Sequence, residues 1–159
     1  MGLIKMAGAL VEVKIEDEEL REILGRVIGH LEDTKPMMAD IGEIVTESVM
    51  RNFEEKRAPD GTPWKPLSEV TKARKLHPEH ILIETTTLRD SIHPEASADR
   101  VEIGTDIVYA AVHQFGIGER SVISSRRRMP EIPARPFLGV RDDDWDEIKE
   151  TVREYLVSD

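Results

Sequence analysis

The chain has 159 residues and no cysteine, and its 32 acidic and 22 basic residues leave a formal net charge of −10. This length fits one domain spanning residues 1–159 with a single core, and the absence of cysteine excludes disulfides and thiolate chemistry. The acidic balance disfavours general nucleic-acid binding, because affinity for a duplex depends on neutralising its phosphates. No apolar run approaches the ~20 residues that a membrane helix needs, so we expect a cytoplasmic protein with no membrane association.

The first third of the chain predicts a strand followed by two helices. Residues 10–15 alternate apolar and polar side chains, which is typical of a half-buried strand. Residues 17–31 carry apolar side chains at helical spacing behind an acidic first turn, which predicts a long amphipathic helix. Pro36 then begins a second helical stripe that runs to Phe53. Two helices joined by a short link can cover one face of a core.

The middle of the chain predicts a loop, a short helix and a hairpin. Residues 57–68 contain three prolines and an Asp-Gly turn signal, and we expect the ring of Trp64 to hold this loop on the core. A short helix is predicted from Ser68 to Leu76. Residues 91–96 and 100–104 alternate around a polar turn, which predicts a β-hairpin.

The last third predicts a core-packed element, an exposed loop, a strand and a helix. Residues 107–116 are small and apolar and end in a His-Gln-Phe-Gly turn, whereas residues 117–131 show no period and carry charges, which favours a long mobile loop. Residues 132–140 are expected to be extended, because their two prolines exclude a helix interior, and to return to the sheet. Three aspartates, candidates for the N-cap, precede the apolar stripe of a final helix, which comprises Trp145, Ile148, Val152, Tyr155 and Leu156.

This order of elements predicts an α+β fold. A small antiparallel sheet would pack against two long N-terminal helices and a C-terminal helix, with a long mobile loop before the last strand and the final helix.

Two histidines suggest a metal site. His77 and His80 are three residues apart and Glu84 is close, so a metal-dependent hydrolase is one alternative function. Pro78 disfavours the helix that would bring the two rings together, and the motif of zinc proteases is absent. We therefore expect a surface turn here and no metal or cofactor.

His113 suggests a catalytic base, but the sequence offers no arrangement to support it. The nearby serines fall in the predicted mobile loop, and neither a nucleophile elbow nor a phosphate-binding loop is present. A histidine that closes a buried segment explains the residue equally well. We expect no enzymatic activity.

Basic residues concentrate near the predicted mobile loop. They could form a solvated loop, contact an acidic surface of a neighbouring subunit, or touch the phosphates of passing DNA, as in a DNA-contacting connector protein. Aromatic residues are not interleaved with them, which disfavours a stacking platform for single strands. The candidate assembly interface comprises Arg120, Arg126, Arg127, Arg128, Arg135 and Phe137.

Three motifs in order resemble those of a known family. They are "APDGTPWKPLSEVT" from residue 58, "IGTDIVYAAVHQFG" from residue 103 and "IPARPFLG" from residue 132. Together they resemble the phage virion morphogenesis family, the tail completion proteins of Mu-like and related tailed phages and prophages. One departure is visible: Thr86 and Thr87 precede Leu88, where the family commonly has Thr-Gly.

The resemblance implies a structural protein of the phage particle. It would complete the tail and enable the tail to join the head through oligomeric assembly. Its partners would be other tail or neck proteins and further copies of itself, in a ring. It would be located in the host cytoplasm during assembly and then in the virion, at the tail or the head-tail interface. No catalytic residues come with this family.

Overall fold

The protein is described by a computed structural model that covers residues 10–11, 33–83, 85–118, 122–124, 127–128 and 131–157, together with four single positions between 22 and 29. Its helices are α2 (Lys35–Glu55), α3 (Glu69–Arg74), α4 (Thr87–Asp90), α5 (Ala110–Phe115) and α6 (Asp142–Val157). Its strands are β1 (Leu10–Val11), β2 (His93–Ala96), β3 (Val101–Gly104), β4 (Val122–Ser124) and β5 (Arg127–Arg128). The predicted α+β class is confirmed.

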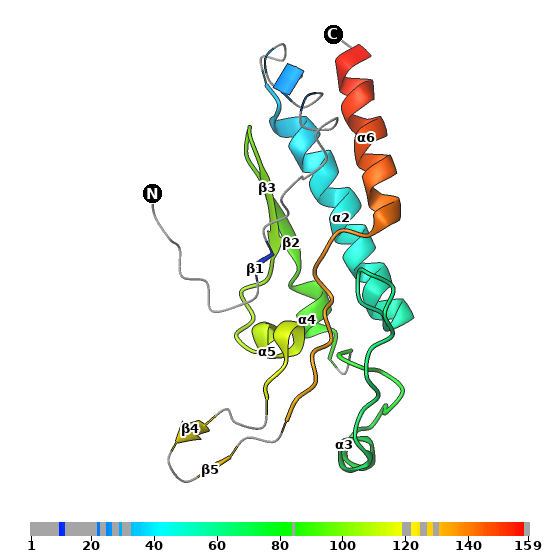
Figure 1. Cartoon of the computed structure of the whole chain (residues 1–159), viewed down its shortest axis with the longest axis vertical. Helices are drawn as coiled ribbons and strands as arrows, with labels where there is room; N and C mark the ends of the chain where they lie inside the picture. Colours follow the sequence, from blue (N-terminus) through cyan, green and yellow to red (C-terminus); the bar gives the residue numbers. More distant parts are fainter. Residues whose placement is uncertain are drawn as a thin grey trace.

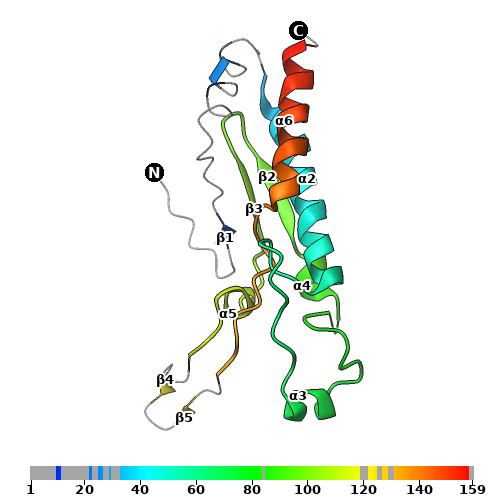
Figure 2. The same ribbon diagram turned by 45° about the vertical axis from the view of Figure 1, so that its right-hand side comes forward.

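The described elements form an elongated molecule (Figures 1 and 2). Helices α2 and α6 lie side by side, and the β2–β3 hairpin follows α2 on its other side. Helix α3 and the β4–β5 ribbon project at the end that lies opposite the last turn of α6. Within the described part of the chain, no helix is long and apolar enough to cross a membrane.

Helix α2 is the central element of the core. Its apolar stripe is buried along the whole helix, and Pro36 lies in its first turn, where a missing backbone N–H has no cost. A Cβ on Gly42 would lie 2.7 Å from the Cβ of Pro94 and 3.0 Å from Val101, so the glycine lets the hairpin approach the helix closely. The buried apolar residues around the helix are Met37, Met38, Ile41, Val45, Val49, Phe53, Ala58, Trp64, Leu88, Ile92, Ile103, Ala110, Phe137, Leu138, Ile148 and Val152.

The sheet has three strands in the order β1–β3–β2, and both pairs are antiparallel. The predicted hairpin is therefore confirmed, with Ala96 opposite Val101 next to its turn. The expected strand at residues 10–15 is present at its first two positions, which pair with Gly104 and Ile103, and the remainder lies outside the described residues. The exposed positions of β2 carry polar side chains, with His93 Nε2 3.7 Å from Glu95 Oε1.

Helix α6 packs on α2 through Ile148 and Val152, and its first turn is fixed by a buried carboxylate. Asp144 Oδ2 accepts a hydrogen bond from the backbone N–H of Arg141 at 2.7 Å, and its Oδ1 accepts one from Arg51 at 2.9 Å. The third residue of the helix thus reaches back to the residue that precedes it, as in one half of a capping box.

Several expectations need correction. Residues 132–140 do not return to the sheet, and only Ile132 forms an isolated bridge, to Ile117. Pro133 and Pro136 have no backbone N–H to donate, and the side chain of Gln114 binds the backbone where a partner strand would. The described parts of the expected mobile loop include the paired strands β4 and β5. Leu156 is 38% exposed and does not belong to the buried stripe of α6. The expected helix at residues 17–31 lies outside the described residues except for Glu22, Gly25, Arg26 and Gly29, which have helical backbone.

Candidate functional site

The extended segment 131–140 connects the β4–β5 ribbon to α6, and Gln114 binds its backbone. Gln114 Oε1 accepts hydrogen bonds from the N–H groups of Phe137 at 3.0 Å and Leu138 at 3.1 Å. Its Nε2 donates to the carbonyl of Leu138 at 3.1 Å. Since Gln114 is only 7% exposed, it supplies in the interior the bonds that a neighbouring strand would supply.

Two further side chains bind the same segment from the side of α2. Trp64 Nε1 donates to the carbonyl of Pro136 at 2.7 Å, and Asn52 Nδ2 donates to the carbonyl of Phe137 at 3.0 Å. The rings of Trp64 and Phe53 meet edge to face at 5.6 Å, and Phe137 lies 5.2 Å from Phe53. The expectation that Trp64 pins its loop to the core is confirmed, and its anchor is this segment.

Arg135 joins two segments that are distant in sequence. Its Nε donates to the carbonyl of Lys65 at 2.8 Å and its Nη2 to that of Pro66 at 3.1 Å. Its backbone N–H donates to the backbone carbonyl of His113 at 2.7 Å. Burial lowers the pKa of Arg135, although a guanidinium keeps its charge in proteins. The loop that leads to α3 is thereby fixed relative to α5.

The β4–β5 ribbon begins where Ile117 and Ile132 exchange two backbone hydrogen bonds, at 2.8 and 2.9 Å. Gly116 precedes this pair with φ at +74°, and a Cβ there would lie 2.7 Å from the backbone nitrogen of Ala134. Only glycine fits both the conformation and the close approach. This requirement explains the last residue of the "HQFG" motif.

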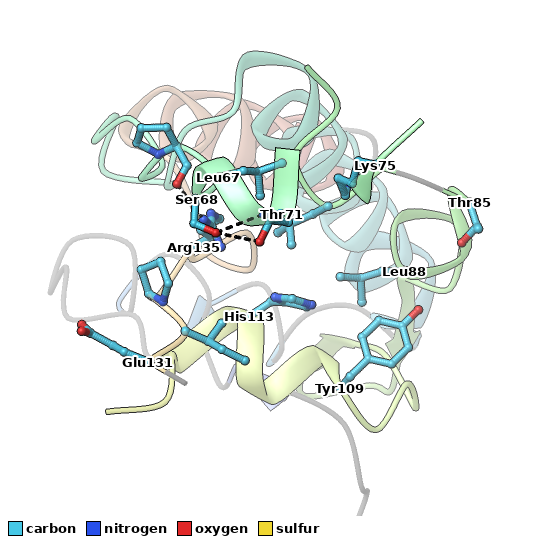
Figure 3. Close-up of a pocket in the computed structure, with 14 residues that line it drawn as sticks. Leu67, Ser68, Thr71, Lys75, Thr85, Leu88, Tyr109, His113, Glu131 and Arg135 are labelled. Atoms are coloured by element: carbon cyan, nitrogen blue, oxygen red, sulfur yellow. Dashed lines mark hydrogen bonds between the residues drawn. The ribbon is translucent and has the colours of Figure 1, made fainter. Parts of the chain in front are cut away.

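A cleft of about 720 Å³ lies between the α3 region and α5 with the adjoining extended segment. Figure 3 shows Leu67, Thr71 and Lys75 on one side, with His113 and Tyr109 reaching toward them from the other. Two apolar side chains also contribute to its lining, namely Leu82, in the loop before α4, and Leu88, in α4. The cleft is therefore formed by segments that are distant in the sequence and that Arg135 joins.

His113 projects into this cleft (Figure 3). Burial is the main cause that lowers its pKa, and the positive charges of Arg135 and Lys75 lower it further. Its Nδ1 is buried and, among the described residues, has no hydrogen-bond partner. Its ring meets that of Tyr109 edge to face at 5.9 Å. A catalytic base needs an orienting acceptor at this nitrogen, and none of the described residues provides one.

His77 and His80 are close together, as the metal-site alternative requires. Their rings stack with centroids 5.4 Å apart, and Glu79 Oε1 lies 3.4 Å from His77 and 3.7 Å from His80. Glu84, the third ligand of that alternative, lies outside the described residues. Over the part of the chain that the structure describes, no group of three or more histidine or carboxylate side chains could hold a metal ion.

The residues of the candidate assembly interface fall in three places. Arg120 and Arg126 lie outside the described residues, and Arg127 and Arg128 are described by their backbone, as strand β5. Arg135 is 5% exposed and Phe137 is fully buried, so these two side chains pack within the subunit and present no free surface. Arg135 and Phe137 are close to the arginine run along the chain, which is why the sequence groups them with it. In the structure both residues belong to the extended segment that Gln114 binds.

Exposed apolar side chains occur instead in and next to α3 and α5, and one of them, Tyr109, lines the cleft. Val70 and Leu76, in and after α3, are 63% and 84% exposed, and Val108, Tyr109 and Phe115, next to or in α5, are 70%, 46% and 66% exposed. The sequence did not indicate this exposure, because Val108 and Tyr109 lie in an apolar run that predicts a core-packed element, and the other three residues occur singly among polar or small neighbours.

Comparison with known proteins identifies the chain's relatives. The model of the phage virion morphogenesis family matches residues 15–157. The chain is 33% identical over 148 residues to Mu-like prophage FluMu G protein 2 of Haemophilus influenzae, which covers 92% of this chain and 96% of the relative. It is 28% identical over 150 residues to tail completion protein S of Escherichia phage P2, which covers 87% of this chain and 97% of the relative. No solved structure gives a significant match. The resemblance carried by the three motifs is confirmed, and the chain belongs to the phage virion morphogenesis family.

Proposed function

We propose that this chain is a structural protein of a phage or prophage particle that completes the tail and prepares it to join the head. One observation carries the proposal: the similarity to tail completion protein S extends over 97% of that relative and 87% of this chain. A match over nearly the whole of both chains supports a shared role of the whole protein, beyond a shared module.

The described geometry supports a structural role over an enzymatic one. His113 has no orienting acceptor among the described residues, and the described part of the His77–His80 turn has no third ligand. In contrast, side chains from three segments fix the backbone of residues 131–140, which holds the cleft end in a defined shape. A subunit whose cleft is held in a defined shape suits assembly.

The proposal includes partners, location and domain organisation. The chain acts in the host cytoplasm during assembly and remains in the virion at the tail or the head-tail interface, where it contacts other tail or neck proteins and further copies of itself. Head-to-tail contacts between copies close into a ring when the rotation between neighbours allows closure. Residues 1–159 act as one domain, which the family match over residues 15–157 supports.

The test uses a phage or inducible prophage that encodes this chain, with an amber codon early in the gene. Electron microscopy of lysates from a non-suppressing host is expected to show filled heads and unjoined tails, and a suppressing host should restore complete particles. A normal yield of infectious particles in the non-suppressing host would overturn the proposal.

A further inference from the structure

Residues 65–80, which we call the α3 arm, have few buried contacts with the rest of the molecule. None of these residues is buried, and helix α3, at the centre of the arm, contributes no side chain to the core. In Figures 1 and 2 this helix projects at the end opposite the last turn of α6. Because α3 has only 6 residues, it is marginal as a helix by itself, and the shape of the arm depends on the contacts that hold it.

Two basic side chains lie where the arm meets the rest of the cleft. Arg135 holds the start of the arm, since its guanidinium donates to the carbonyls of Lys65 and Pro66 at 2.8 and 3.1 Å. Lys75 follows α3 and belongs to the arm itself. Both cations line the cleft together with His113, which reaches toward the arm from α5 (Figure 3). The ring of His113 is therefore close to positive charges on two different segments.

The closed cleft disfavours a positive charge on His113. A charged imidazole donates from both ring nitrogens, but Nδ1 is buried and none of the described residues offers it an acceptor. Burial and the positive charges of Arg135 and Lys75 lower the pKa of the ring. The lining has two other titratable side chains: Tyr109, whose ring meets His113 edge to face, and Glu131, which points away from that ring in Figure 3. Thus no described carboxylate of the lining is placed to neutralise a charge on His113.

We propose that charging of His113 releases the α3 arm from α5. When the ring is charged, Nδ1–H needs water as an acceptor and the nearby cations repel the ring, and both costs fall when the cleft opens. The arm moves in preference to α5, because the buried Gln114 fixes α5 to the extended segment whereas no residue of the arm is buried. The inference adds a conformational step to the structural role proposed above and does not depend on that role.

The direction of the pH dependence follows from the two forms of the cleft. The pKa of His113 is lowered in the closed form and returns toward its ordinary value of about 6.5 when the ring is hydrated in the open form. Closure is therefore fully stabilised above about pH 6.5 and weakens as the pH falls below this value. Acid should open this end of the molecule while the core remains folded.

Hydrogen exchange followed by mass spectrometry tests the release on the full-length chain at pH 7 and pH 5, with rates corrected for the pH dependence of exchange in unstructured peptides. Exchange in residues 65–80 is expected to be several-fold faster at pH 5, while exchange in α2 is unchanged. His113→Gln, which cannot acquire the charge, should lose this response. His93→Gln, which replaces an exposed histidine of β2, is the matched control and should keep it.

Three results would overturn the inference. They are an arm whose exchange does not respond to pH in the wild type, a response of His113→Gln equal to that of the wild type, and an equal acceleration in α2, which would indicate general unfolding. A second measurement needs no variant. In an NMR titration of the wild type, the midpoint for the His113 ring should coincide with the midpoint of the change in exchange, and coincidence with His77 or His80 instead would also overturn the inference.

Discussion

Replacing Gln114 tests whether its side chain substitutes for a partner strand. Gln114→Met keeps the approximate volume of the side chain but removes three hydrogen bonds to Phe137 and Leu138. Each buried backbone group left without a partner costs ~1–3 kcal/mol, so the three groups left unpaired should cost the variant on the order of 3–9 kcal/mol of unfolding free energy. This is a large part of the about 5–15 kcal/mol that stabilises a typical domain.

A second substitution separates hydrogen bonding from volume. Gln114→Ala leaves space in which water can bind the two N–H groups and the carbonyl, so we expect it to cost no more than Gln114→Met. Urea denaturation followed by tryptophan fluorescence measures both, since Trp64 is buried beside the same segment. Lys72→Ala, in an exposed ion pair with Glu69, is the control and should change stability by less than about 0.5 kcal/mol. A Met variant as stable as the wild type, with an unstable Ala variant, would refute the reasoning, because volume alone would then matter.

Three further predictions concern the same end of the molecule and the start of α6. Gly116→Ala should lower the unfolding free energy by at least about 2 kcal/mol through strain and backbone overlap, whereas Gly118→Ala, whose Cβ meets nothing within 4 Å, should be neutral in the same urea titration. Because the pKa of His113 is lowered in the folded state, its contribution to stability is complete above the unfolded value of about 6.5 and decreases as pH falls below it. The difference in stability between wild type and His113→Gln should therefore shift against the wild type between pH 7 and pH 5, and a pH-independent difference contradicts this. Asp144→Ala should cost about 1–3 kcal/mol in thermal or urea unfolding, since it leaves the backbone N–H of Arg141 unpaired and removes the closer of the two carboxylates beside Arg51, while Asp143→Ala, which is exposed, should cost far less.

The elements with strong local periodicity could be predicted from the sequence. The spacing of apolar residues gave α2 and α6, alternation around a polar turn gave the β2–β3 hairpin, and the Asp-Gly signal gave the turn at Gly61, where φ is +81°. In α2, α6 and the hairpin, the apolar residues whose spacing predicts the element include those that it buries in the core.

Tertiary contacts decide the parts that the sequence did not predict. Residues 107–112 form a short apolar run, so no period distinguished α5, whose buried Gln114 bonds to residues 23 and 24 positions later. The prolines of residues 131–140 predicted an extended segment but could not name what it contacts. The cleft joins residues 66–75 to residues 109–135, and no local pattern shows such a meeting. One signal was available in part: Asn52 lies on the apolar stripe of α2, where a polar residue needs a buried partner.

The attachment of residues 136–144 to α2 has a consequence for synthesis on the ribosome. The bonds that complete the core join Trp64 to Pro136, Asn52 to Phe137 and Arg51 to Asp144. Their sequence separations are 72, 85 and 93 residues. During translation these three side chains have no hydrogen-bond partner in the core until residues 136–144 have been synthesised. Contacts of such long range form slowly and late. A nascent subunit therefore lacks a finished core until the first turn of α6 has been synthesised, because Asp144 supplies the acceptors for Arg51 and for the backbone N–H of Arg141.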